Sequence, residues 1–265
     1  MAYHDLRDYL AQLESSGQLR RVDELVATEL ETTSLCVRAL RAEGPALLFE
    51  RPSSSAHPLL GNLFGHRKRI EAALAGRPLS SLRELGELLA AIKEPRWPGS
   101  VREALAAWPE FAQLAHAAPR RVPDAAFRDE VLTGEDVDLM RLPIQRCWPD
   151  DAGLLLTMAM VVTRGTRRER QNVGIYRQQV LGRNRVIMRW LPHRGGALDF
   201  ADWRAAHPDR PFPVLVAIGA DPAMMLAAVA PVPDTLSEFQ FAGLLRGERS
   251  RVWRSDLTGL DAPAG

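Results

Sequence analysis

The spacing of hydrophobic residues predicts a first part of the chain in which helices alternate with short buried strands. Residues 4–16 carry apolar side chains at helical intervals, at Leu6, Tyr9, Leu10 and Leu13, and Gly17 follows as a helix stop. The same reasoning predicts further helices at 29–42, 66–75, 80–93 and 100–116, and strands at 46–50 and 58–64. Helices that alternate with buried strands are typical of an α/β layer.

The pattern changes after residues 117–129, a stretch rich in Pro, Arg and Ala that we interpret as a linker. Short apolar segments separated by turn residues then predict strands at 130–134, 136–143, 157–165, 172–179, 185–191 and 213–220. Two helices interrupt them, one beginning at Asp221-Pro222 and one covering 236–246 before Gly247, and the last ten residues, 256–265, look like a frayed tail. We therefore divide the chain into two domains, 1–118 and 119–265.

Composition narrows the classes of partner. The 265 residues carry a formal net charge of +1, with 46% hydrophobic and 25% charged residues, as in an ordinary globular protein. The basic residues, nearly all arginine, are spread along the chain, which does not favour a nucleic-acid binder. Cys36 and Cys147 have no metal-ligand spacing, and the sequence contains neither a signal-peptide pattern nor an apolar run of about 18 residues. We expect a cytoplasmic protein that at most rests on a membrane surface.

One stretch, residues 172–200, contains more charged residues and glycines than a buried hairpin requires. If 172–179 is a regular strand, Asn172, Gly174 and Tyr176 share one face and Arg177 lies on the other. A single ligand meets both Asn172 and Arg177 only if the chain kinks between them. Gly174 is where a kink costs least, so we predict one there.

The segment PHRGG, residues 192–196, and the residue Glu238 each have two interpretations. The segment either exposes backbone N–H groups that, with Arg194, suit a phosphate, or forms an ordinary tight turn. Glu238 completes a capping-box pattern with Thr235, yet together with Asn172 and His193 it offers ligands that Mn²⁺ or Mg²⁺ prefers. The residues alone leave these alternatives open.

Several longer segments resemble one known family. NVGIYRQQ, RVIMRWL, HRGGALDF and PDTLSEFQFAGLLRG, together with GPALLFE, GNLFG, CWPDDAG and GADPA, resemble the UbiD-type decarboxylases in order along the chain. Within that family the resemblance is strongest to the bacterial enzymes that decarboxylate 3-polyprenyl-4-hydroxybenzoate in ubiquinone synthesis. It implies an α+β protein, in which an N-terminal α/β domain precedes an incomplete split β-barrel like that of flavin reductases.

The resemblance also implies a cofactor and the residues that hold it. The cofactor is prenylated FMN (prFMN), whose phosphate is held by a divalent ion, usually Mn²⁺, with potassium (K⁺) nearby. Carried over by position, the ion ligands are Asn172, His193 and Glu238. The residues that line the cofactor are Ile175, Tyr176, Arg177, Arg189, Trp190, Leu191, Arg194 and Gly195. Arg177 corresponds to the arginine that directs the substrate carboxylate, which makes it the candidate catalytic residue.

Partners are implied in the same way. They are an aromatic acid with a polyprenyl tail, which would bring the protein to the inner membrane surface, and a flavin prenyltransferase that supplies the cofactor. Family members are longer than this chain, form homo-oligomers, and carry an acidic proton donor and a further glutamate in the part that this chain lacks. We therefore expect a non-oxidative carboxy-lyase that is weak or inactive by itself. The alternatives are a non-catalytic flavin-phosphate-binding fragment or one half of a split decarboxylase.

Overall fold

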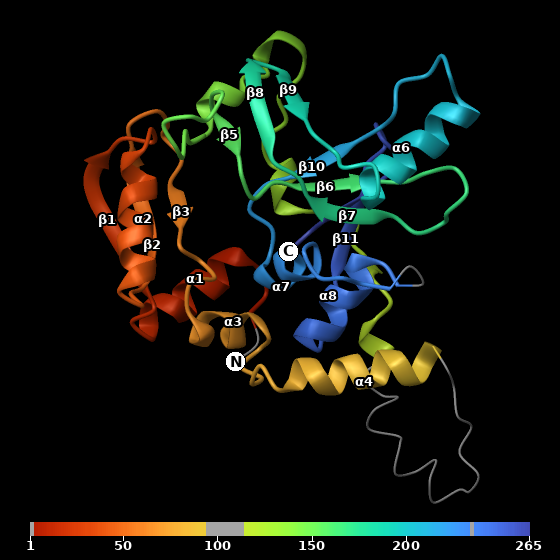
Figure 1. Cartoon of the computed structure of the whole chain (residues 1–265), viewed down its shortest axis with the longest axis horizontal. Coiled ribbons are helices and arrows are strands. Elements are labelled where there is room, and N and C mark those ends of the chain that lie inside the picture. Colours follow the sequence, from red (N-terminus) through yellow and green to blue (C-terminus); the bar gives the residue numbers. More distant parts are fainter. Residues whose placement is uncertain (1–2, 94–113, 234–235) are drawn as a thin grey trace, which may run out of the picture.

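The N-terminal part of the chain builds a three-stranded sheet with helices beside it (Figure 1). The computed structural model describes residues 3–93, 114–233 and 236–265. Strand β1 (Leu19–Val26) runs parallel to β2 (Ala46–Pro52), and β3 (Leu59–Gly61) runs antiparallel to β2. The helices are α1 (Leu6–Ser15), α2 (Glu31–Arg41), α3 (Arg67–Ala73) and α4 (Ser81–Lys93). The predicted alternation of helices and strands is confirmed in this part.

Two details of this part differ from the prediction. Strand β1 was not predicted, because only its end residues Leu19 and Val26 are buried and the residues between them are largely polar. The helix predicted at 100–116 lies outside the described residues up to residue 113, and Leu114–His116 form a 3₁₀ turn.

A buried arginine ties helices and loops of the N-terminal part together. Arg69 on α3 is 0% exposed, and its guanidinium donates to the carbonyl oxygens of Leu63, Gly44 and Asn62 at 2.8, 3.0 and 3.1 Å. The hydroxyl of Tyr9 on α1 donates to the Arg69 carbonyl at 2.6 Å. These bonds hold α1 and α3 against the segment that precedes β2 and the segment that follows β3.

The second part of the chain builds three small sheets of three strands each. The first sheet has the order β10 (Leu215–Ala217), β6 (Met160–Thr163), β7 (Asn172–Ile175). The second has the order β5 (Leu155–Leu156), β8 (Gln178–Gly182), β9 (Arg185–Met188). The third has the order β12 (Asp261–Pro263), β11 (Arg251–Arg254), β4 (Arg120–Arg121). Helices α6 (Gly195–Ala206), α7 (Pro222–Ala227) and α8 (Glu238–Arg246) lie around them (Figure 1). Within the described residues no sheet closes on itself. The chain is thus a mixed α/β protein, and the split barrel implied by the resemblance is not confirmed.

Strands β6 and β7 have one face in the apolar core and the other face toward α6. Val162 and Val173 are opposed across the two strands and belong to a core that includes Phe239 of α8. The next opposed pair, Thr163 and Asn172, points to the other face because side chains alternate along a strand. That face is covered by α6 (Figure 1). The alternation therefore directs Thr163 and Asn172 toward α6, with the apolar Val161 on the same face, and directs Val162 and Val173 toward the core.

Two strands predicted early in this part are absent. Residues 130–134 and 136–143 contain 3₁₀ turns at Gly134–Asp136 and Leu139–Arg141 instead of strands. The side chain of Val131 is 71% exposed, so the apolar residues of this segment form no buried face. A short apolar run predicts a strand only where a neighbouring strand can pair with it.

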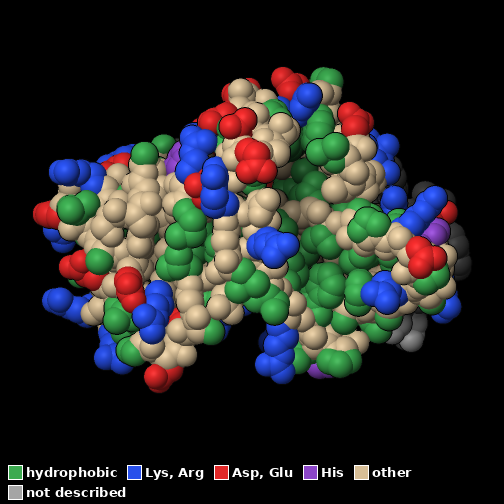
Figure 2. Space-filling model, turned by 90° about the horizontal axis from the view of Figure 1, so that it is seen from above, with side chains coloured by type: hydrophobic (Ala, Val, Ile, Leu, Met, Phe, Trp, Pro, Cys, Tyr) green, Lys and Arg blue, Asp and Glu red, His purple; other side chains and the backbone are tan. Residues whose placement is uncertain are grey.

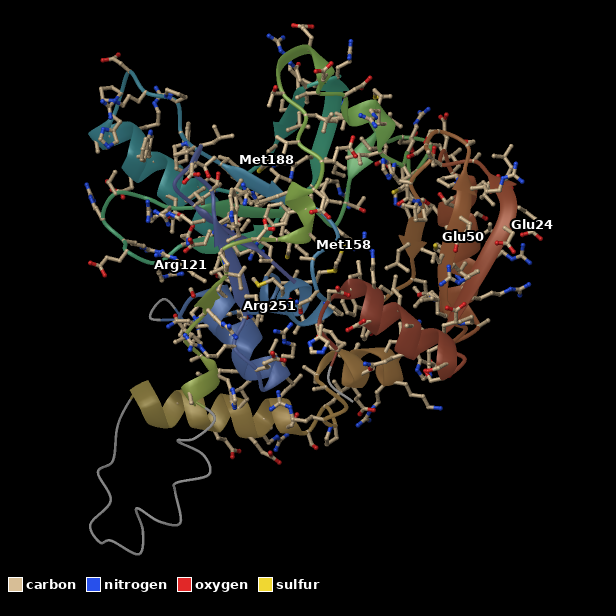
Figure 3. All side chains as sticks on the ribbon, turned by 180° about the vertical axis from the view of Figure 1, so that it is seen from behind. Glu24, Glu50, Arg121, Met158, Met188 and Arg251 are labelled. Carbon is tan, nitrogen blue, oxygen red and sulfur yellow. The ribbon has the colours of Figure 1, made fainter. Side chains whose placement is uncertain are left out.

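The C-terminal tail is ordered, so the prediction of a frayed end is wrong. Strand β12 pairs antiparallel with β11, and its three residues are buried. The Gln171 side chain donates to the Asp261 carboxylate at 2.8 Å and accepts from the Asp261 backbone N–H at 2.6 Å. The guanidinium of Arg251, labelled in Figure 3, donates to the His4 carbonyl at 2.8 Å. The last strand of the chain is therefore held by contacts with distant segments, which hydrophobic spacing does not reveal.

Part of the strand-rich surface is apolar. Seen from above, hydrophobic side chains gather over the middle of the molecule (Figure 2). Exposed large apolar side chains of this part include Met158, Leu181, Ile187 and Ile218. Apolar side chains next to open sheet edges favour association with other polypeptide.

Candidate functional site

The candidate site is built around Asn172, at the start of β7. Asn172 lies opposite Thr163 on β6, and its side-chain Nδ2 donates to the Thr163 hydroxyl at 3.2 Å. The Thr163 hydroxyl donates in turn to Oδ2 of Asp199 on α6 at 2.7 Å. The Asn172 amide oxygen, Oδ1, lies against Gly195 at the first residue of α6. Asn172 is therefore held between the neighbouring strand and a helix start.

Thr163 and Asp199 were not predicted as site residues. Both are buried, and burial raises the pKa of the Asp199 carboxyl. Thr163 belongs to the site only because the register of β6 against β7 places it opposite Asn172. Asp199 belongs to a helix that the sequence pattern did not predict, so no sequence signal connected either residue to Asn172.

Glu238 reaches the same strand from α8. It is the first residue of that helix, whose N-cap is Ser237, and Ser237 forms a capping box with Gln240. Ser237 is thus the N-cap, so the interpretation of Glu238 as part of a capping box with Thr235 does not hold; Thr235 itself lies outside the described residues. Glu238 instead accepts the backbone N–H of Val173 with Oε2 at 2.9 Å. Burial raises the pKa of Glu238, and the nearby charge of Asp199 raises it further.

Glu238 reaches the outer edge of β7 next to the backbone of Asn172. This strand is the last in its sheet, and the Val173 N–H that Glu238 accepts belongs to the peptide that joins Asn172 to Val173. His193 is exposed in the turn before α6 and makes no hydrogen bond to either residue in the described part of the chain. The described residues hold no group of three or more His, Cys, Asp or Glu side chains that could bind a metal. The three predicted ion ligands, Asn172, His193 and Glu238, include only two side chains of these four types.

The two glycines of PHRGG begin a helix that the sequence pattern did not predict. Gly195 is the first residue of α6, and its N-cap Arg194 makes no side-chain cap bond. The Gly196 N–H donates to the Tyr176 hydroxyl at 3.2 Å, and a Cβ on Gly196 would lie 3.0 Å from the Trp190 ring. The first N–H groups of a helix have no partners within the helix. The start of α6 therefore offers backbone donors next to Asn172.

The predicted kink at Gly174 is wrong. Strand β7 pairs with β6 in unbroken register from Asn172 to Ile175. The chain leaves one sheet for another at Tyr176 and Arg177, the two residues between β7 and β8. Gly174 has a packing role, since a Cβ there would lie 2.7 Å from the Tyr176 ring. The strand predicted at 172–179 is thus two strands in different sheets.

Three exposed arginines surround this region. The register of the β8–β9 hairpin places Arg177 next to Arg189, and Arg194 precedes α6. None of the three has an acidic ion-pair partner among the described residues. Of the other predicted cofactor residues, Ile175 packs against the core and Leu191 is exposed. The Trp190 ring lies edge-on to the Tyr176 ring, with centroids 6.0 Å apart. The region is cationic and partly aromatic, which suits a flat anionic ligand.

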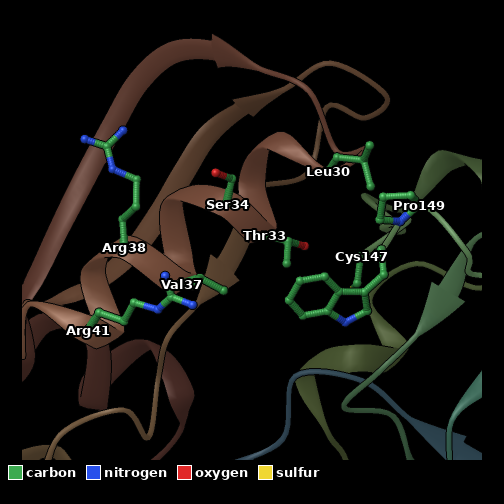
Figure 4. Close-up of a pocket in the computed structure, with 9 residues that line it drawn as sticks. Leu30, Thr33, Ser34, Val37, Arg38, Arg41, Cys147 and Pro149 are labelled. Atoms are coloured by element: carbon green, nitrogen blue, oxygen red, sulfur yellow. The ribbon is translucent and has the colours of Figure 1, made fainter.

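Two hollows of the described surface lie apart from the predicted residues. One of about 350 Å³ is lined in part by Gln171 and Ser237, the chain neighbours of Asn172 and Glu238. Another of about 290 Å³ lies between α2 and the segment 147–149, and Arg38 and Arg41 line it (Figure 4). Neither of these two hollows is lined by a predicted site residue.

We expect Gly195→Ala to displace the Asn172 amide. The added Cβ would lie 1.9 Å from Oδ1, so either Asn172 or the start of α6 must move. Such overpacking costs about 1–3 kcal/mol in the free energy of unfolding, which urea titration measures. Gly182→Ala is the matched control, because its Cβ would meet no atom within 4 Å. Wild-type stability of Gly195→Ala would contradict the close approach of Oδ1.

Two family models match the sequence. The model for the 3-octaprenyl-4-hydroxybenzoate carboxy-lyase Rift-related domain matches residues 120–265, and the model for the N-terminal domain of the same carboxy-lyase matches residues 10–89. The chain belongs to the UbiD family. The family predicted from the sequence motifs is thus confirmed, at the level of UbiD and not of the ubiquinone enzyme within it.

Solved UbiD-class structures resemble the chain over its whole length. HmfF from Pelotomaculum thermopropionicum in complex with FMN is 29% identical with a TM-score of 0.78, over 99% of this chain and 53% of HmfF. An evolved dimeric HmfF in complex with prFMN has the same identity and TM-score, over 99% of this chain and 55% of its own. Vanillic acid decarboxylase from Sedimentibacter hydroxybenzoicus, in closed form, is 26% identical with a TM-score of 0.80, over 100% of this chain and 53% of its own. This UbiD-family chain therefore spans about half the length of the structures it matches.

Proposed function

We propose that this chain is the prFMN-binding part of a non-oxidative UbiD-type decarboxylase, a carboxy-lyase. The observation that carries the proposal is that the Glu238 carboxylate accepts the Val173 N–H, next to Asn172 in the chain, while the Asn172 amide oxygen lies against the start of α6. Membership of the UbiD family and the likeness to structures that contain FMN or prFMN support this cofactor. The same findings do not favour a purely non-catalytic fragment.

Asn172, His193 and Glu238 would hold a divalent cation, for which Mn²⁺ is our proposal. An amide oxygen, an imidazole and a carboxylate form a donor set that suits such an ion. Glu238 is buried close to the carboxylate of Asp199, and a cation beside it would offset the burial that raises its pKa. His193 is two residues before Gly195, which contacts Asn172, so its imidazole would enter from the turn before α6.

The phosphate of the cofactor would bind where the start of α6 meets Asn172. Backbone N–H groups at a helix start and the guanidinium of Arg194 are suitable phosphate donors. The cofactor ring would be lined by Ile175, Tyr176, Arg177, Arg189, Trp190, Leu191 and Gly195, as the resemblance implies. When bound, prFMN supplies the electron sink that loss of CO₂ requires. The chain's own residues anchor and orient the cofactor and place Arg177 to hold the substrate carboxylate.

The substrate we propose is 3-polyprenyl-4-hydroxybenzoate, following the strongest sequence resemblance. Its polyprenyl tail would bring the protein to the inner membrane surface, and a flavin prenyltransferase would supply the cofactor. Among the described residues no helix is long and apolar enough to cross a membrane. The matched structures are about twice as long as this chain, so turnover would require the remaining part of such an enzyme, as a homo-oligomer.

In an enzyme completed by the remaining part that turnover requires, Arg177→Lys should weaken decarboxylation without releasing the cofactor. A guanidinium binds a carboxylate through two parallel hydrogen bonds, which an ammonium group does not reproduce. Loss of one charge-assisted bond lowers CO₂ release by roughly 10-fold to 100-fold. The control is Arg185→Lys, also exposed but outside the predicted site. Wild-type CO₂ release by Arg177→Lys would exclude the proposed role of Arg177.

Co-expression with a flavin prenyltransferase tests the proposed function. We expect the purified chain to carry a flavin, seen in its absorption spectrum, together with an equimolar amount of Mn²⁺ measured by mass spectrometry. A chelator that removes Mn²⁺ should release the flavin as well, because the ion is proposed to hold the phosphate. A chain that binds neither prFMN nor FMN in the presence of Mn²⁺ would refute the proposal.

A further inference from the structure

A chain of hydrogen bonds connects α6 to the Asn172 amide through buried groups. The Asp199 carboxylate accepts the Thr163 hydroxyl at 2.7 Å, and the same hydroxyl oxygen accepts Nδ2 of Asn172 at 3.2 Å. Thr163 is 0% and Asp199 3% exposed, so water does not compete for these bonds. The Gly165 backbone N–H also donates to Asp199. The bonds therefore join three elements, β6, β7 and α6.

The chemistry of the three groups sets the direction of every bond. A carboxylate only accepts, so the single hydroxyl proton of Thr163 goes to Asp199. The Thr163 oxygen is then left as an acceptor, and only the nitrogen side of the Asn172 amide can donate to it. Burial raises the pKa of Asp199, but the hydrogen bonds that it accepts from the Thr163 hydroxyl and the Gly165 N–H stabilise its ionised form. The Asn172 amide is thereby turned so that Oδ1 faces away from Thr163, against the start of α6.

We propose that Thr163 and Asp199 are positioning residues that lock the Asn172 amide with its oxygen presented to a cation. The inference rests on the proposed role of Asn172 as an ion ligand. The two ends of a side-chain amide have almost the same shape, so hydrogen bonds alone decide which end faces the ligand. A flipped amide would present its N–H hydrogens to the cation and could not bind it. Without the lock, the Asn172 side chain would have to be both turned and held in place on binding the ion, so the apparent affinity would fall.

The test uses variants that break the bonds while keeping side-chain volume. Thr163→Val removes the hydroxyl, whereas Thr163→Ser keeps it. In Asp199→Asn, one side-chain oxygen remains to accept both the Thr163 hydroxyl and the Gly165 N–H. Asp202→Asn is the matched control, because this carboxylate lies on the same helix but contacts Thr166 and Arg167. One readout is Mn²⁺ affinity in the presence of FMN, measured by electron paramagnetic resonance. The other needs no metal: hydrogen exchange of the Asn172 side-chain amide by ¹⁵N nuclear magnetic resonance, with the signal identified by its loss in Asn172→Ser.

We expect Thr163→Val and Asp199→Asn to bind Mn²⁺ about 10-fold to 100-fold more weakly, as is typical when the partner of a metal ligand is removed. In both variants the Asn172 amide hydrogens should exchange faster. Thr163→Ser should restore both properties, and Asp202→Asn should match the wild type. A general loss of packing would not be rescued by serine, which has less volume than valine or threonine.

Two results would overturn the inference, and a third would overturn the function beneath it. Rapid amide exchange in the wild-type chain would show that the hydrogen-bond chain does not form. Unchanged Mn²⁺ affinity in Thr163→Val, with faster exchange, would show that the bonds form but do not position a ligand. Failure of the wild-type chain to bind Mn²⁺, with slow exchange, would refute the ligand role of Asn172 and the proposed function while showing that the bonds exist.

Discussion

Glu238→Gln should abolish the Mn²⁺-dependent binding of FMN. In the wild type, the Glu238 carboxylate accepts the Val173 N–H at 2.9 Å. Glutamine keeps an oxygen that can accept this N–H, but it removes the negative charge that would bind the ion. Changes next to a metal ligand cost about 10-fold to 100-fold in affinity, so removal of a charged ligand should lower Mn²⁺ affinity by more than about 100-fold. Titration with Mn²⁺ in the presence of FMN measures the effect.

The stability of this variant separates loss of the ligand from damage to the fold. Burial raises the pKa of Glu238, so a neutral side chain suits the position at least as well as a carboxylate. The metal-free variant should therefore unfold at or above the wild-type temperature, and Mn²⁺ should raise the unfolding temperature of the wild type but not that of Glu238→Gln. Glu248→Gln, an exposed change just beyond α8, is the control and should keep the response to Mn²⁺. A response to Mn²⁺ that persists in Glu238→Gln would contradict the proposed ion site.

Arg69→Met should cause the largest loss of stability among single changes in the N-terminal part. Methionine fills much of the same volume but leaves the carbonyl oxygens of Leu63, Gly44 and Asn62 buried without their donor. A buried polar group that loses its partner costs about 1–3 kcal/mol. Removal of the charged group recovers part of this cost, since burial lowers the pKa of the guanidinium and so disfavours its charged form. We expect a net loss of about 3 kcal/mol in the free energy of unfolding, measured by urea titration.

Arg67→Met is the matched control for this experiment. Arg67 lies on the same helix two residues earlier, but it is exposed, and among the described residues it pairs only with Glu71 across one helical turn. An exposed pair of this kind contributes about 0.3–0.5 kcal/mol, so the control should remain close to the wild type. A loss below about 1 kcal/mol in Arg69→Met would show that the carbonyl oxygens find other donors.

The sequence by itself determined the family and the alternation of side chains along β7. Motifs such as NVGIYRQQ and HRGGALDF keep their order along the chain, and the family they predict is confirmed. Alternation alone predicted Asn172 and Tyr176 on one side of the chain, and both contact the first turn of α6, although β7 ends at Ile175. The roles assigned to Arg177 and His193 stay predictions. Strong local patterns were sufficient for the N-terminal helices, whose apolar residues recur over several turns.

Only the tertiary structure decided which residues surround Asn172. Thr163 and Asp199 enter through strand register and through α6, which begins with two glycines and has no apolar stripe that a sequence pattern could detect. The same holds for the break at Tyr176 and Arg177 and for the buried strand β12, because strands of three to five residues are too short to show a period. Such strands are ordered by pairing with distant segments and not by local preference. Long-range pairing is therefore what assembles the site, whereas local sequence supplies its individual residues.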